Sequence, residues 1–150
     1  MNLNNLLQNH VLWTAMAGWL LAQLLKVPLD SIRNHRWNWA LFFAAGGMPS
    51  SHSSLVTSTA MAVGLYTGFE NPLFAVALAF AMVVVYDAMG VRRQSGMQAE
   101  KINILVDELL HGHPINEKHL LEAVGHTPLE ALGGAVLGVI TALGLWLLWR

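Results

Sequence analysis

The sequence predicts an all-α integral membrane protein, a helical bundle of about four transmembrane helices plus short amphipathic surface helices. Hydrophobic residues make up 55% of its 150 residues and charged residues only 11%, whereas about a quarter of the residues in a soluble domain are charged. The mean hydropathy of +0.47 agrees with this class. The length suits a single domain, which we expect to cover residues 1–150.

The composition also excludes several classes of protein. A net charge of −1 provides no basic field for binding nucleic acid. The absence of cysteine excludes disulfides, thiolate metal sites and cysteine nucleophiles. The first 25 residues contain no lysine or arginine and so lack the positive segment of a signal peptide, and we expect them to be retained.

Four uncharged apolar runs predict the transmembrane helices. They are Leu6 or Val11 to Leu25, Ser53–Phe69, Leu73–Tyr86 and Ala131–Trp149. The second run is rich in small residues, which suit close packing between helices rather than contact with lipid. The turn Glu70-Asn71-Pro72 joins the second and third runs into a hairpin. In the fourth run, Gly134 and Gly138 have the GxxxG spacing that is typical of a helix contact.

The connecting segments predict shorter elements. Lys26 begins a polar break, and Leu41–Gly47 is short enough to be interfacial or re-entrant. Apolar and charged residues alternate at helical spacing over Met97–His111, which predicts an amphipathic helix. Glu117–Val124 predicts another short helix.

With four spans, the connection between the first and second spans and the connection between the third and fourth spans lie on the same face of the membrane. These two connections carry seven of the eight lysines and arginines, so the positive-inside rule makes this face cytoplasmic. The same count brings reactive side chains that are far apart in sequence to this face, namely His52, Asp87, Arg92, Arg93 and His126.

The segment Gly46–Ser54, GGMPSSHSS, predicts an anion site at the start of the second span. A proline followed by hydroxyl residues is typical of a helix start, because Pro49 fixes φ and Ser50 or Ser51 can cap. The first N–H groups of a helix attract anions, and His52 adds a side chain that titrates near neutral pH.

Three separated motifs resemble a known family, in the family's order. They are MPSSHSS at residues 48–54, VYDAMGVRRQSG at 85–96 and GHTPLEALGG at 125–134. Together they resemble the divergent, small bacterial and plastid branch of the type 2 phosphatidic acid phosphatase superfamily, which also includes vanadium haloperoxidases. The resemblance covers roughly residues 20–140.

The parent superfamily has the patterns KxxxxxxRP, PSGH and SRxxxxxHxxxD, and this chain departs from each of them. Lys26 and Arg33 have the spacing of the first, with Asn34 in place of the proline. Residues 49–52 match the second, with Ser51 in place of the glycine.

The third pattern is matched in part. His126 and Glu130 fit HxxxD, with glutamate in place of aspartate. Leu120 stands at the position of the pattern's arginine, and Arg92 or Arg93 is our candidate to supply that guanidinium instead.

The resemblance implies a mechanism without metal or other cofactor. His126 would attack phosphorus to form a phosphohistidine, Glu130 would orient its ring, and His52 would protonate the leaving oxygen. Phosphoryl transfer needs mainly positioning and charge neutralisation, which arginine and a helix N-terminus provide. The groups that hold the phosphoryl oxygens would be Lys26, Ser50, Ser51, Arg92 and Arg93, with Asp87 in support.

The same residues also have purely structural interpretations. His52 fits as an ordinary polar residue at a helix start. Thr127-Pro128-Leu129-Glu130 has the pattern of a capping box, a role that is compatible with the chemical one. Arg92 and Arg93 fit as interfacial anchors. Asp87 either pairs with one of them or ends a span.

A further histidine pair has a metal-like spacing. His111 and His113 form an HxH sequence, but the sequence shows no third ligand, so a surface loop is the better interpretation.

We therefore expect a small membrane phosphatase that acts on a lipid phosphate or diphosphate, because a lipid presents its headgroup at the interface where these residues gather. The alternative is a non-catalytic membrane protein that binds or transports a lipid phosphate, and Leu120 favours it. The expected partners are membrane lipid and the lipid phosphate substrate, without nucleic acid, and the GxxxG spacing makes a homodimer reasonable. The expected location is a bacterial cell membrane, with the active face on the cytoplasmic side.

Overall fold

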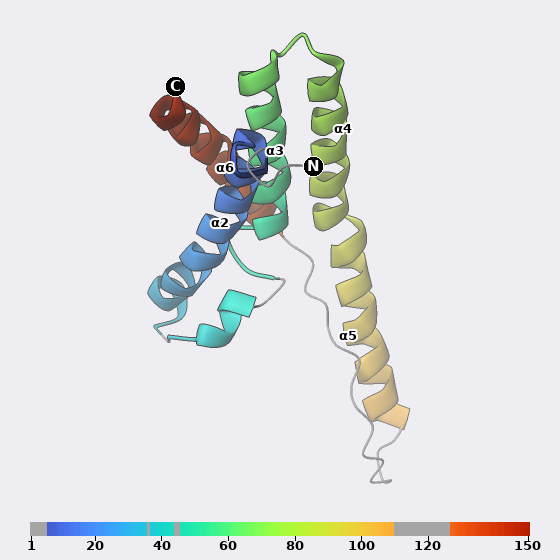
Figure 1. Ribbon diagram of the computed structural model, residues 1–150. Helices are drawn as coiled ribbons and strands as arrows, with labels where there is room; N and C mark the ends of the chain where they lie inside the picture. Colours follow the sequence, from blue (N-terminus) through green and yellow to red (C-terminus); the bar gives the residue numbers. More distant parts are fainter. Residues whose placement is uncertain (1–5, 36, 44–45, 110–126) are drawn as a thin grey trace.

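The computed structural model describes residues 6–35, 37–43, 46–109 and 127–150. These residues form helices and no strand, which confirms the predicted helical membrane bundle. The elements are α2 (His10–Asn34), the 3-10 helix η1 (Trp39–Phe43), α3 (Ser51–Thr67), α4 (Pro72–Met89), α5 (Val91–Leu109) and α6 (Pro128–Trp149) (Figure 1).

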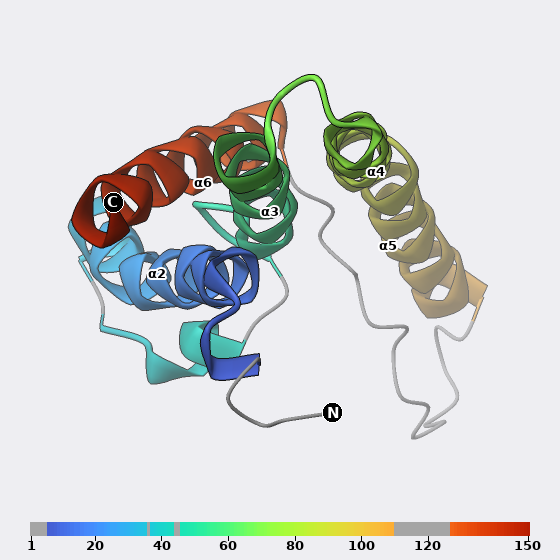
Figure 2. The ribbon, with the colours of Figure 1, turned by 45° about the horizontal axis from the view of Figure 1, so that its top comes forward.

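Helix α3 is the centre of the bundle. It contacts α2, α4 and α6, and α2 also contacts α6. Figure 2 shows α2, α3 and α6 packed together, with α4 on the outer side of α3. Helices α4 and α5 follow one another almost in line, and α5 extends beyond the other helices (Figure 1).

Three of the described helices are long and apolar enough to cross a membrane, over His10–Ile32, Pro72–Met89 and Pro128–Trp149. Helix α3, the predicted second span, has 17 residues and is therefore roughly 26 Å long, slightly less than the hydrocarbon thickness. Much of its surface is buried against its neighbours. We therefore describe α3 as an inner helix surrounded by three helices that face lipid.

The predicted end of the first span at Leu25 is wrong. Helix α2 continues through Pro28 to Asn34, and His35 caps it in the left-handed region with a φ of 53°. Lys26 is only 1% exposed, so the charge that suggested a polar break instead faces the interior of the bundle. Proline is tolerated in a membrane helix where neighbouring groups satisfy the freed backbone.

The predicted start of the amphipathic helix at Met97 is also wrong. Helix α5 begins at Val91, directly after Gly90, which ends α4 with a non-helical ψ of −83°. The charged pair Arg92 and Arg93 suggested a connection, but charges are common in a helix that leaves the apolar part of a bundle. The predicted helix over Glu117–Val124 lies outside the described residues.

The short connections agree better with the sequence. Asn71 is the N-cap of α4 and Pro72 its first residue, which confirms the predicted turn. Part of the segment predicted to be interfacial forms η1, which turns back onto α2: the Gln23 side-chain amide donates to the Phe42 carbonyl at 3.0 Å.

Glycine lets α6 approach α3 closely. A Cβ atom at Gly134 would overlap the Ser50 carbonyl oxygen, and one at Gly138 would lie 2.5 Å from the Ser54 carbonyl oxygen. At this contact Thr57 Oγ1 donates to the Ala135 carbonyl at 3.2 Å. The GxxxG pair thus makes a helix contact, as predicted, but within the chain. A homodimer stays a prediction.

Helix α2 meets an adjacent side of α3 in the same way. A Cβ atom at Gly18 would lie 2.5 Å from Ser58 Oγ, and Ser54 Oγ donates to the Gly18 carbonyl at 2.8 Å. Hydroxyl groups that bond backbone carbonyls across small residues are typical of close helix packing in membranes.

We predict that Gly138→Ala destabilises the bundle. The added methyl group meets backbone atoms of α3, and such overpacking costs about 1–3 kcal/mol of the free energy of unfolding. Reversible unfolding in mixed micelles, followed by tryptophan fluorescence, measures the change. Gly144→Ala on the same helix is the matched control, because its Cβ would meet nothing within 4 Å. Equal changes in the two variants would contradict the packing described here.

Candidate functional site

The start of α3 is fixed by its cap and by α6. Ser50, one of the two predicted candidates, is the N-cap, and its Oγ accepts a hydrogen bond from the Ser53 N–H at 3.3 Å. The Ser50 N–H in turn donates to the Glu130 carbonyl at 3.0 Å. The first turns of α3 and α6 therefore lie together, and the first N–H groups of each helix lack acceptors within that helix.

Lys26 connects α2 to this helix start. Its Nζ donates to Ser51 Oγ at 3.5 Å, and both residues are buried. Ionisable residues within membrane helices are costly and are usually found facing a bundle interior at functional positions. The structure thus brings together two of the predicted phosphate-binding residues that are 25 positions apart in sequence.

A cavity of about 350 Å³ opens beside this contact. This volume is at the lower end of the range for small-molecule sites. Its lining includes one basic and two acidic side chains, Lys26, Asp30 and Glu130. The remaining described lining residues are Leu29, Asn34, Leu41, Gly47 and Met48.

Glu130 has the structural role that its sequence context predicts. Its Oε2 accepts from the Thr127 N–H at 3.0 Å, and Thr127 Oγ1 accepts from the Glu130 N–H at 3.3 Å. This reciprocal pair is a capping box with Pro128 as the first helical residue. Glu130 also lines the cavity, as Lys26 does.

His52 lies on a different side of α3 from Ser51. It is half-buried and one turn before Val56, a residue of the apolar cluster that α3 forms with Ala81 of α4. Helical periodicity therefore directs His52 toward the α4 side, whereas Ser51 contacts Lys26 of α2. His52 is not among the described residues that line the Lys26 cavity.

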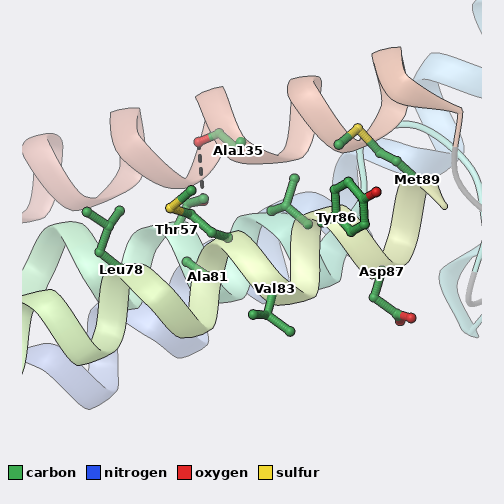
Figure 3. A pocket seen from close by; sticks show the side chains of 10 residues that line it. Thr57, Leu78, Ala81, Val83, Tyr86, Asp87, Met89 and Ala135 are labelled. Atoms are coloured by element: carbon green, nitrogen blue, oxygen red, sulfur yellow. Dashed lines mark hydrogen bonds between the residues drawn. The ribbon is translucent and has the colours of Figure 1, made fainter. Parts of the chain in front are cut away.

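Asp87 lines a second cavity, a groove. An apolar groove of about 730 Å³ runs along α4, with Thr57 of α3 and Ala135 of α6 in its lining (Figure 3). Asp87 is a lining residue near the C-terminal end of α4, and Figure 3 shows its side chain pointing away from α6. The structure thus does not bring Asp87 into the cavity of Lys26 and Glu130.

Other predicted site residues are outside what the structure describes. His126, like the HxH pair His111 and His113, precedes the described start of α6. Arg92 and Arg93 lie in the first turn of α5, but their side chains are not described. Among the described residues, no group of three or more acidic or histidine side chains is arranged to hold a metal ion.

Sequence analysis missed two polar residues of the cavity, Asp30 and Asn34. They follow Lys26 at spacings of four and eight along α2, and Asn34 Nδ2 donates to Asp30 Oδ1 at 2.7 Å. That spacing is a detectable signal for one helix face. It was hidden because the polar residues after Leu25 suggested that the helix had ended.

Comparisons with known proteins agree with the motifs. Residues 7–141 match the model of the Divergent PAP2 family. The uncharacterized membrane protein YuiD of Bacillus subtilis is 38% identical over 153 aligned residues, which cover 93% of this chain and 96% of that protein. No solved structure matches the chain.

We predict that the cavity binds an oxyanion through Lys26. Saturating orthovanadate, at a hundred times its dissociation constant, should stabilise the wild type by about 2.7 kcal/mol. Lys26→Met should lose this stabilisation because the ammonium group is gone. Thermal unfolding in detergent, with and without vanadate, measures both. Lys101→Met, at an exposed position of α5, is the control that should keep the shift. An equal shift in all three proteins would place vanadate binding elsewhere.

Proposed function

The chain belongs to the Divergent PAP2 family, and from this membership we propose that it hydrolyses a lipid phosphate or diphosphate through a phosphohistidine intermediate. The supporting observation is the buried contact between Lys26 and Ser51. It joins a residue of the parent superfamily's first pattern to one of its second pattern, at the start of a helix.

The contact has the physical properties that phosphoryl transfer needs. The Lys26 ammonium group supplies positive charge inside the bundle, and the first turn of α3 supplies N–H groups and the positive end of a helix dipole. Enzymes that transfer phosphoryl groups act mainly by positioning the group and neutralising its charge. Lys26, Ser50 and Ser51 are therefore our proposed phosphate-binding residues, together with Arg92 and Arg93.

The proposed reaction uses two histidines. A ring nitrogen of His126 forms a bond to phosphorus while the bond to the ester oxygen breaks, and His52 gives its proton to that oxygen. Water then attacks phosphorus while the bond to the His126 nitrogen breaks, and the deprotonated His52 takes a proton from this water as inorganic phosphate is released. Glu130, four residues after His126, is the proposed orienting group, and Asp87 the proposed supporting carboxylate.

Location supports a lipid as the substrate. The cavity lies near the C-terminal end of α2 and the N-terminal end of α6, two helices that are long and apolar enough to cross the membrane. A lipid headgroup could reach this level while its chains remain in the bilayer. We propose a bacterial cell membrane and, from the distribution of lysine and arginine, a cytoplasmic active face.

A non-catalytic lipid-phosphate binding or transport protein is the second candidate. Leu120 stands at the position of the arginine in the parent superfamily's third pattern, and arginine is the residue best suited to clamp a phosphoryl group. A binding protein would keep the anion site of Lys26 and Ser51 without turnover.

We predict that both histidines are needed for turnover. The purified protein in detergent should release phosphate from a panel of lipid phosphates without added metal, and vanadate should inhibit this release. His52→Ala should lower kcat by about 100-fold or more, as expected for loss of a general acid, and His126→Ala should abolish release.

His35→Asn is the control, because His35 is an exposed helix cap in the left-handed region, where asparagine is well tolerated. Turnover that survives His126→Ala would refute the phosphohistidine. No turnover of any lipid by a wild type that still binds vanadate would favour the binding protein.

We also predict that Glu130→Gln separates the two roles of Glu130. Glutamine can complete a capping box, so the free energy of unfolding should change by less than about 0.5 kcal/mol. The loss of the carboxylate should nevertheless lower kcat by about ten-fold or more if it orients His126. Unfolding and phosphate release are measured on the same preparation. A variant that is fully active would leave Glu130 with the capping role alone.

A further inference from the structure

The cavity beside Lys26 has two chemically different ends along one face of α2. Lys26, Asp30 and Asn34 are spaced four residues apart, so they follow one another at about 6 Å per step along the helix. Exposure increases in the same direction, from Lys26 at 1% to Asn34, which is exposed. A basic group therefore lies at the deep end of the stripe, and an acidic group bonded to an amide lies toward the outer end.

Asp30 is a carboxylate with unused hydrogen-bonding capacity. Its Oδ1 accepts from Asn34 Nδ2 at 2.7 Å, and within the described residues this is its one hydrogen bond. The residue is half-buried, lies within the His10–Ile32 span and lines the cavity. Acidic residues inside membrane spans usually face a cavity and mark a ligand pathway.

The charge of Asp30 is unsuitable for binding phosphate. A phosphate monoester is an anion, and like charges at short range repel each other. An ionised carboxylate can only accept hydrogen bonds, so the part of a ligand that lies against Asp30 must carry a donor, either a hydroxyl or an ammonium group. The Asn34 side chain has a carbonyl oxygen and a second N–H that can complete such a contact.

The cavity has room for more than a phosphoryl group. Its volume of about 350 Å³ corresponds to on the order of ten water molecules, whereas a phosphate group consists of one phosphorus and its oxygens alone. A phosphate bound near Lys26 therefore leaves space toward Asp30 for the carbon atoms next to the ester.

We propose that Asp30 and Asn34 form a specificity subsite for a hydrogen-bond donor on the carbon next to the one that carries the phosphate ester. This inference rests on the proposed function and names its substrate class: lipid phosphates whose alcohol bears a free hydroxyl or ammonium group. Phosphatidic acid lacks such a donor, because the oxygen on the carbon next to the phosphate-bearing carbon is acylated, and prenyl phosphates carry no hydroxyl or ammonium group on that carbon. Sites that hydrogen-bond a substrate group discriminate strongly against analogues without that group.

The test compares matched pairs of substrates with the purified full-length protein in detergent. Lysophosphatidic acid, with its free hydroxyl, is compared with its methyl ether at that oxygen. Sphingosine phosphate, with its ammonium group, is compared with ceramide phosphate, in which the same nitrogen is an uncharged amide. Phosphate release gives kcat/KM for each. We expect the member with the free hydroxyl or the ammonium group to be preferred in at least one pair by about ten-fold or more, the ratio for one charge-assisted hydrogen bond. The amide of ceramide phosphate keeps one N–H donor but has lost the charge.

Variants assign the preference to residues. Asp30→Asn should bring the kcat/KM ratio of the preferred pair close to one, mainly through KM. Asn34→Leu should lower the ratio as well, because it removes the group that orients Asp30. Glu70→Gln is the matched control, since Glu70 is an exposed carboxylate in the turn between α3 and α4, and it should keep the wild-type ratio.

The outcomes separate this inference from the proposed function. Turnover with ratios near one in both wild-type pairs would overturn the subsite while the phosphatase stands, and this result does not depend on any variant folding. A preference that survives Asp30→Asn in a folded protein would overturn the role of Asp30. No turnover of any substrate would overturn the phosphatase and the subsite together. The pair that shows the preference identifies the donor as hydroxyl or ammonium.

Discussion

The close approach of α3 to α2 and α6 is the constraint on which the rest of the structure depends. Gly18, Gly134 and Gly138 leave no space for a side chain at these contacts, so the backbone of α3 is held against its neighbours on two sides. The Ser50 N–H then reaches the Glu130 carbonyl, which sets the first turns of two helices side by side. In a membrane this arrangement depends on packing and hydrogen bonds, because lipid offers no hydrophobic gain for helix association.

The buried lysine is explained better by the proposed function than by stability. Moving an ammonium group into the bundle carries a desolvation penalty, and apolar residues of similar size are often at least as stabilising at such positions. The contact with Ser51 and the carboxylates that line the cavity reduce this penalty without requiring a lysine. A positive charge at the start of a capped helix is, however, what an oxyanion needs. At this site the bundle therefore tolerates the desolvation penalty of a buried ammonium group.

The predictable parts of this fold are those encoded over a few residues. The capping box at Thr127 and Glu130, the cap at Ser50 and the turn before Pro72 follow from local hydrogen-bond chemistry. The sequence predicted the box and the turn correctly and narrowed the cap to Ser50 or Ser51. The end of α2 was not, because a lysine after an apolar run looks the same in sequence whether it faces water or Ser51. The hairpin predicted α4 as a neighbour of α3, but the packing of α2 and α6 on α3 was beyond the sequence, and the cavity with Asp30 depends on that packing.

The division of the candidate site over two sides of α3 follows from helix geometry. Consecutive residues are turned by about 100°, so Ser51 and His52 diverge, one toward Lys26 of α2 and the other toward the α4 side. The axis of α3 lies between these two directions, and the N–H groups of its first turn point along the axis toward the N-terminal end. A phosphoryl group held in front of the first turn would therefore be approached by a cation from one side and by an imidazole from the other. Such an arrangement separates the group that neutralises charge from the group that transfers a proton, and one helix start is enough to position both.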